Sequence, residues 1–123
     1  MFARTLRQNF CVRATQLEMG ARSVIITRES GCFALVRDGS RMRRLQAETP
    51  ILERVAPVGS GDALLAGFLA ARRQERSVEE SLRYAVACGA ANTQTVGAGV
   101  LDARDATRFL QGVQVRELDR VAG

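Results

Sequence analysis

The stretch APVGSGDALLAGFLAARR, residues 56–73, decides the fold of this chain. Glycines on either side of a serine are followed at once by Asp62, and an almost wholly apolar run then extends from Ala63 to Ala71. Such a run predicts a helix that is buried on most of its sides. The candidate strand ILERVA at 51–56 leads directly into the glycines, so the stretch predicts a strand, a glycine loop and a buried helix in succession.

The glycine loop predicts an anion site at the start of the helix. The first amides of a helix have no intrahelical partner, and the helix dipole places partial positive charge there. Glycine allows the backbone to approach a ligand closely and to adopt positive φ. Phosphate is the anion that most naturally binds at such a turn.

Asp62 has two interpretations from the residues alone. A carboxylate beside a phosphate site is suited to accept the proton of a hydroxyl that attacks the phosphate. An aspartate in the first turn of a helix is also a common cap that favours the dipole. The stretch lacks the Gly-Lys-Ser/Thr of a P-loop, and Val58 stands where a nucleophile elbow would have its first glycine.

The remaining pattern predicts an α/β fold without repeats or linkers. Further strands are expected at 23–27, as a buried parallel strand, and at 32–36, 41–46 and 113–118, the last at a sheet edge. Helices are expected at 3–18, after Ser77 in a capping box with Glu80, and after Asp102 as a cap.

Composition narrows the chemistry. The 123 residues fit one domain, and the absence of histidine excludes Ser-His and Cys-His nucleophile pairs and histidine metal sites. Cys11, Cys32 and Cys88 lack metal-ligand spacing and are expected to be buried free thiols. No apolar stretch is long enough to cross a bilayer and no signal-peptide core is present, so we expect a cytoplasmic protein with no membrane partner.

The net charge of +5 raises the alternative of a nucleic-acid binder. All 18 basic residues are arginines, and they are spread along the chain without interleaved aromatic residues that could stack on bases. Nucleic acid is therefore an unlikely partner from the sequence, and steep salt-dependent binding would be its signature.

The segment VGSGDALLAGFLAA at 58–71 resembles the signature of the ribokinase-like, or PfkB, family of carbohydrate kinases. Pro57 and Val58 directly precede Gly-Ser-Gly-Asp, and in this the chain is similar to the 1-phosphofructokinase and tagatose-6-phosphate kinase branch. MGARSVIIT at 19–27 and SLRYAVACGAANTQTVGAG at 81–99 follow the family's order, so the resemblance covers about residues 13–111. It implies the C-terminal part of a ribokinase-like three-layer αβα fold, as a single partial domain over residues 1–123.

The resemblance also implies roles for single residues. Asp62 matches the catalytic base that deprotonates the sugar hydroxyl. The matches to the anion hole are the backbone amides of Gly59, Ser60 and Gly61. The matches to the nucleotide site are Thr27, Gly31, Gly89 and Asn92, although glycine and alanine on the last helix also suit plain helix packing.

The chain departs from the family at three places. Glu29 stands where a glycine usually follows Thr27, and glycine comes only at Gly31. The residues before the loop, 56–58, lack the Asp and Thr of branches activated by a monovalent cation. The N-terminal sugar-binding region and the Asn-x-x-Glu motif associated with Mg²⁺ have no match, so no metal ligand is identified.

We therefore expect ATP-dependent phosphorylation of a sugar or sugar phosphate, with ATP and Mg²⁺ as cofactors. The expected partners are the nucleotide, a sugar-phosphate substrate, and a second copy of the chain or a missing N-terminal half. The alternative is a non-catalytic truncated remnant that acts at most as a nucleotide-binding module.

Overall fold

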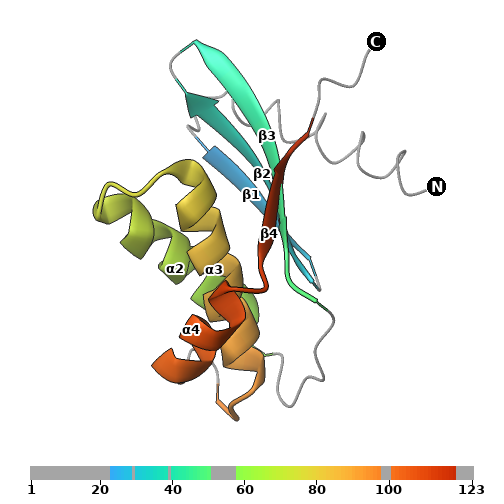
Figure 1. Ribbon diagram of the computed structural model, residues 1–123, viewed down its shortest axis with the longest axis vertical. Helices are drawn as coiled ribbons and strands as arrows, with labels where there is room; N and C mark the ends of the chain where they lie inside the picture. The colour runs from blue at the N-terminus through green and yellow to red at the C-terminus, as the bar shows by residue number, and fades with distance from the viewer. Residues whose placement is uncertain (1–22, 29, 39, 51–57, 98–100, 119–123) are drawn as a thin grey trace, which may run out of the picture.

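The computed structural model describes residues 23–28, 30–38, 40–50, 58–97 and 101–118. These residues form a four-stranded sheet with three helices on one side of it (Figure 1). The strands are β1 (Ser23–Arg28), β2 (Gly31–Asp38), β3 (Arg41–Glu48) and β4 (Gln114–Glu117). The helices are α2 (Ser60–Arg73), α3 (Val78–Thr93) and α4 (Ala103–Leu110). Helix α3 packs against the sheet, and the other two helices pack against α3. The expected α/β class is confirmed.

The strands lie in the order β1-β2-β3-β4, and every neighbouring pair is antiparallel. β2 is buried on both faces because its residues alternate between two apolar clusters. Cys32, Ala34 and Val36 contact the cluster on the helix side, whereas Phe33 and Leu35 belong to a cluster on the opposite face. Because successive side chains of a strand point to opposite faces, β2 contributes to the apolar clusters on both sides of the sheet.

The expectation of a parallel strand at 23–27 is wrong. β1 pairs antiparallel with β2, with Arg28 opposite Gly31, so only two residues connect the strands. A parallel pair needs a crossover of a dozen or more residues. The run is continuously apolar because Ile25 contacts the helix-side cluster while Val24 and Ile26 contact the cluster on the other face.

The buried helix is longer than expected, and it is covered on one side only. α2 begins at Ser60 and ends at Arg73, and its buried residues face α3. Leu65 and Leu69, in contrast, are 49% and 58% exposed. The expectation of burial on most sides is therefore wrong within the described residues, because no described element covers the outer face of α2.

Helix α3 is the central helix, and most of its residues from Val78 to Thr93 are buried. Its expected cap is confirmed, since Ser77 Oγ accepts a hydrogen bond of 3.1 Å from the amide of Glu80. Asp102 caps α4 in the same way, accepting 2.8 Å from the amide of Arg104. Both caps satisfy amides that the helix itself leaves unpaired.

Two other expectations are confirmed: β4 lies at the sheet edge next to β3, and Cys32 and Cys88 are buried free thiols. The candidate helix at 3–18, the candidate strand at 51–56, Cys11 and Glu29 lie outside the described residues. None of the helices in the described part of the chain has both the length and the apolar character that crossing a bilayer demands.

Candidate functional site

The start of α2 presents backbone amides that no side chain caps. Gly59 is the N-cap, with φ 87° and ψ 0°, a left-handed conformation that glycine adopts without strain. Its carbonyl accepts the first helical hydrogen bond, 3.0 Å from the amide of Ala63. The amides before Ala63 therefore have no intrahelical acceptor, and the described residues supply no side-chain cap for them.

A cavity of about 600 Å³ opens beside these amides. Its walls come from the end of β1, the turn into β2, the residues after β3, the first turns of α2 and the last turns of α3. The lining residues are Thr27, Arg28, Ser30, Gly31, Thr49, Pro50, Ser60, Gly61, Leu64, Val86, Gly89, Ala90 and Thr93. None of these described residues is acidic, and the guanidinium of Arg28 lies against Phe33, on the other face of the sheet.

The structure brings most of the predicted nucleotide and anion residues together. Thr27, Gly31, Ser60, Gly61 and Gly89 all line the cavity, although they come from four elements. Gly61 leaves room at this point, because a Cβ atom built on it would meet no atom closer than Thr27 Cγ2 at 4.0 Å.

Two of these glycines also have steric reasons that need no ligand. A Cβ on Gly31 would lie 2.0 Å from the carbonyl oxygen of Ala47, so β2 and β3 could not pair there. A Cβ on Gly89 would lie 3.1 Å from the carbonyl oxygen of Ser60, so it permits the close approach of α3 to the start of α2. Strand pairing and helix packing therefore explain these two glycines of the cavity wall without a ligand.

Asp62 and Asn92 lie outside the cavity wall. Asp62 is exposed in the first turn of α2, directly after the lining residue Gly61. Asn92 is fully buried, and its Nδ2 donates a hydrogen bond of 2.9 Å to the carbonyl of Val58. Asn92 therefore contacts the residue that directly precedes the glycine loop.

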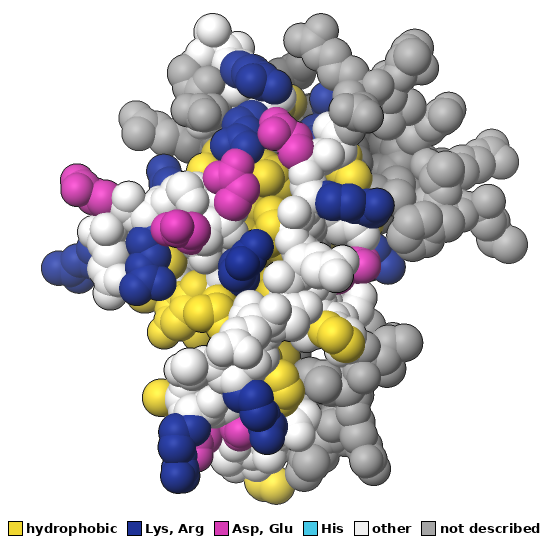
Figure 2. Space-filling model, in the orientation of Figure 1, with side chains coloured by type: hydrophobic (Ala, Val, Ile, Leu, Met, Phe, Trp, Pro, Cys, Tyr) yellow, Lys and Arg dark blue, Asp and Glu magenta, His cyan; other side chains and the backbone are white. Residues whose placement is uncertain are grey.

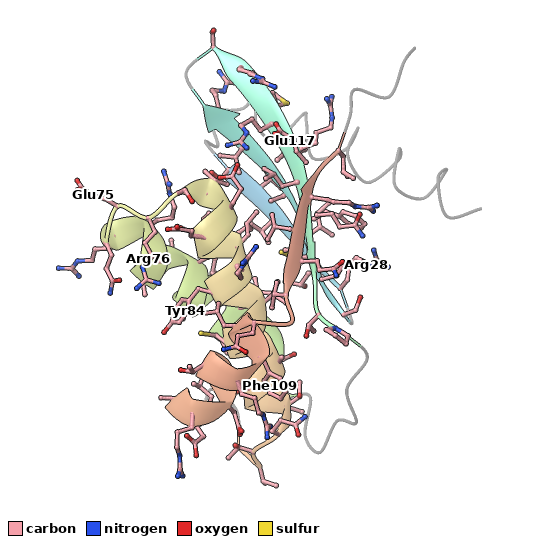
Figure 3. All side chains as sticks on the ribbon, in the orientation of Figure 1. Arg28, Glu75, Arg76, Tyr84, Phe109 and Glu117 are labelled. Carbon is pink, nitrogen blue, oxygen red and sulfur yellow. The ribbon has the colours of Figure 1, made fainter. Side chains whose placement is uncertain are left out.

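Sequence reasoning did not single out Arg28, which lines the cavity at the end of β1 although its guanidinium lies against Glu48 and Phe33. Arg28 Nη1 is 3.1 Å from Glu48 Oε1, and its guanidinium lies 4.7 Å from the centre of the Phe33 ring. Figure 3 shows Arg28 on the sheet, well away from Arg76 and Tyr84 on the helices. Its position directly after Thr27, at the end of a strand, was the available signal, since strand ends line such sites.

Thr49 and Thr93 are further lining residues that the sequence did not single out. Thr93 Oγ1 donates a hydrogen bond of 2.6 Å to the carbonyl of Ala90 and accepts one of 3.2 Å from Gln94 Nε2. A threonine in a mostly apolar helix gives no sequence signal of its own, because the same residue is common as a plain helix-end residue.

The charged side chains on the face drawn in Figure 2 are mixed. Arginines and acidic residues are interspersed over sheet and helices there, rather than gathered in one basic patch. Among the described residues, no group of three or more cysteine, aspartate or glutamate side chains could hold a metal ion.

Comparison with known proteins agrees with the resemblance that the motif carries. The model of the pfkB family carbohydrate kinases matches residues 8–104. A 1-phosphofructokinase from Vibrio cholerae is 35% identical over 74 residues, which are 60% of this chain and 23% of that protein.

Solved structures show the same fold. A candidate phosphofructokinase from Staphylococcus aureus superimposes with a TM-score of 0.71 at 30% identity, over 84% of this chain and 32% of that one. The ribokinase of Arabidopsis thaliana, solved with ribose and ATP, gives a TM-score of 0.66 at 25% identity, over 80% of this chain and 32% of that one. The chain thus spans 23% to 32% of the length of these relatives.

Proposed function

The chain belongs to the pfkB family of carbohydrate kinases, and from this premise we propose that it carries the nucleotide site and the catalytic base of an ATP-dependent sugar-phosphate kinase. The observation that supports this most strongly is the position of the uncapped start of α2. Ser60 and Gly61 line the cavity, and Asp62 follows them on the same helical turn.

The phosphate groups of the nucleotide fit the chemistry of the cavity wall. The backbone amides of Gly59, Ser60 and Gly61 would serve as the anion hole, since they lie at the positive end of the α2 dipole. The hydroxyl of Thr27 adds a donor on the opposite wall. Gly61 keeps the space between the walls open, as a nucleotide phosphate would require.

The adenosine moiety would lie on the apolar wall. Leu64, Val86 and Ala90 line the cavity there, and Gly89 lets α2 and α3 approach each other closely. Apolar walls with a few polar groups are typical of sites for small organic ligands.

Asp62 would act as the base. Its carboxylate accepts the proton of the acceptor hydroxyl as that oxygen bonds to the γ-phosphorus, and the bond from that phosphorus to the bridging oxygen breaks to release ADP. The anion hole amides stabilise the negative charge of the phosphoryl group during transfer. Mg²⁺ would arrive with ATP and neutralise phosphate charge, and no described residue is assigned as its ligand.

The acceptor that we propose is a phosphorylated ketose, so that the product is a bisphosphate. The motif and the Vibrio cholerae relative support a phosphofructokinase-like acceptor. Positioning supplies much of the rate in phosphoryl transfer. Because the chain spans about a third or less of its relatives, the second candidate is a nucleotide-binding module that does not turn over on its own.

Calorimetric titration with Mg·ATP, and with adenosine as a matched ligand without phosphates, tests the nucleotide site. We expect ATP to bind at least about tenfold more tightly than adenosine, because only ATP reaches the amides of α2. Equal affinities, or no binding by a folded chain, would overturn the proposed anion hole. Incubation of the chain with Mg·ATP and fructose 1-phosphate or 6-phosphate then distinguishes a kinase, which releases ADP, from the binding module.

A further inference from the structure

Asn92 is a fully buried polar residue that the proposed mechanism does not use. It lies in the last turn of α3, is fully buried, and donates from Nδ2 to the carbonyl of Val58 at 2.9 Å. The acceptor residue immediately precedes Gly59, the N-cap of α2. The hydrogen bond therefore joins the end of α3 to the glycine loop, across 34 positions of sequence.

The other oxygen of the same side chain argues against a plain packing role. Among the described residues, Asn92 Oδ1 is buried and has no hydrogen-bond partner. A buried acceptor without a partner costs desolvation free energy, which an apolar residue of the same size would avoid. Ala90 and Ala91 directly precede Asn92 in α3. Because Asn92 is present despite this desolvation cost, we infer that the hydrogen bond donated by its Nδ2 has a role.

The geometry of the peptide group shows what that donor controls. The peptide unit between Val58 and Gly59 is planar and trans, so its carbonyl and its N–H point in opposite directions. A hydrogen bond that holds the Val58 carbonyl towards Asn92 therefore also fixes the direction of the Gly59 amide. The side chain of Val58 offers no comparable anchor, because Val58 is 71% exposed.

We propose that Asn92 is a positioning residue, which clamps the Val58 carbonyl and thereby orients the amides of Gly59 to Gly61 for the phosphate group. This inference rests on the proposed function for the anion hole and names a residue that sets its geometry. Asn92 itself does not touch the ligand, and it acts through the Val58–Gly59 peptide.

Asn92→Leu is the decisive variant, because it keeps the branched shape of the side chain while it removes both the donor and the unpartnered oxygen. We expect the folded chain to be at least as resistant to heat as the unchanged one. Its affinity for inorganic tripolyphosphate should fall about fivefold to tenfold, the worth of one ordinary hydrogen bond. The hydrogen-exchange rate of the Gly59 amide should rise, and its NMR resonance should move.

Asn92→Asp is the second variant, since it keeps the shape and one oxygen but places a carboxylate against the Val58 carbonyl. Its affinity for tripolyphosphate should fall at least as far as that of Asn92→Leu. Ser81→Ala is the matched control: it removes another fully buried polar group from α3, distant from the cavity wall. This control should leave both the affinity and the Gly59 amide unchanged.

The two readouts separate the positioning role from the proposed function. If the unchanged chain binds no tripolyphosphate, the anion hole fails, and the Gly59 amide still decides the role of Asn92. A Gly59 amide whose resonance and exchange are the same in folded Asn92→Leu as in the unchanged chain would overturn the positioning role, whatever the affinities.

Discussion

Gly61, the second residue of α2, faces Thr27 near the end of β1, with only 4.0 Å between Thr27 Cγ2 and the position of a Cβ on Gly61. A sheet strand and a helix start thus form opposite walls of one opening. The size of the residue at position 61 controls how much of that opening a phosphate group can use.

Replacement of Gly61 by leucine should lower the affinity for Mg·ATP by about tenfold or more, because the side chain fills the space beside Thr27. Gly61→Ala should have a smaller effect on binding and should stabilise α2 by up to about 1 kcal/mol. Calorimetry gives the affinities, and Ala66→Leu, at an exposed position of the same helix, is the control. Full affinity in Gly61→Leu would contradict a phosphate site at this wall.

Replacement of Asp62 by asparagine should abolish turnover in a chain that carries the rest of the kinase fold. The affinity for Mg·ATP should be unchanged or higher, because a negative charge next to the phosphate site is removed. Steady-state kinetics and calorimetry on the same preparation measure both.

The capping interpretation of Asp62 makes a different prediction. Loss of a first-turn carboxylate alone should cost about 0.3–1 kcal/mol of stability and leave catalysis intact. Asp105→Asn, in the first turn of α4, is the control: it removes a first-turn carboxylate together with the ion pair to the exposed Arg108, and it should show only a small loss of stability. Retained turnover in Asp62→Asn would reduce Asp62 to that role.

Replacement of Gly67 by alanine should destabilise the fold by about 1–3 kcal/mol. Its Cβ would lie 3.0 Å from Cys88 Sγ and 3.2 Å from Ala85 Cα, so α2 and α3 would have to separate. Gly112→Ala is the control, since its Cβ would meet nothing closer than 3.6 Å. Urea denaturation followed by circular dichroism measures both variants, and equal midpoints would show that the helices can move apart at little cost.

Arg43 of β3 makes stability depend on acid pH. It forms ion pairs with Glu117 of β4, at 3.1 Å, and with Glu79 of α3; Glu117 is labelled in Figure 3. Hydrogen bonds from Arg43 lower the pKa of both carboxyl groups from their ordinary value of 4.5. The stabilisation is therefore present above about pH 4.5 and is lost as the pH falls through the lowered pKa values.

The variant Arg43→Gln should be less stable than the unchanged chain at pH 7, and the difference should shrink as the pH falls from 5 to 3. Free energies of unfolding across this range measure it. Arg104→Gln, which removes the exposed ion pair with Asp102, should have little effect at any pH. A difference that stays constant with pH would mean that Arg43 stabilises the fold through packing alone.

Local rules predicted much of the fold. The caps at Ser77 and Asp102 follow from side-chain chemistry within four residues. Strand direction at 23–27 was missed because a continuous apolar run indicates burial on both faces and not a parallel partner. The exposed side of α2 was missed because composition cannot show which neighbours cover a helix.

Some residues of the candidate site could likewise be predicted from the sequence, and others could not. Gly61 and Thr27 could be matched through a motif, and the structure places both at the cavity. Arg28 and the bond from Asn92 to Val58 depend on which elements meet in space, and no local pattern encodes that. The roles of Asp62 and the anion hole stay predictions.

The buried thiols of Cys32 and Cys88 can report local opening of the core, because a thiol reagent reaches them only when the core opens. Burial raises the pKa of Cys32 on β2 to about 12 and raises that of Cys88 on α3 as well, so neither forms the reactive thiolate readily while the core is closed. In a Cys11→Ser background, the rate at which a thiol reagent modifies Cys88 would time the parting of α2 from α3, and the rate at Cys32 would time the opening of the sheet. A ligand that bridges the walls of the cavity should slow the modification of Cys88 more than that of Cys32.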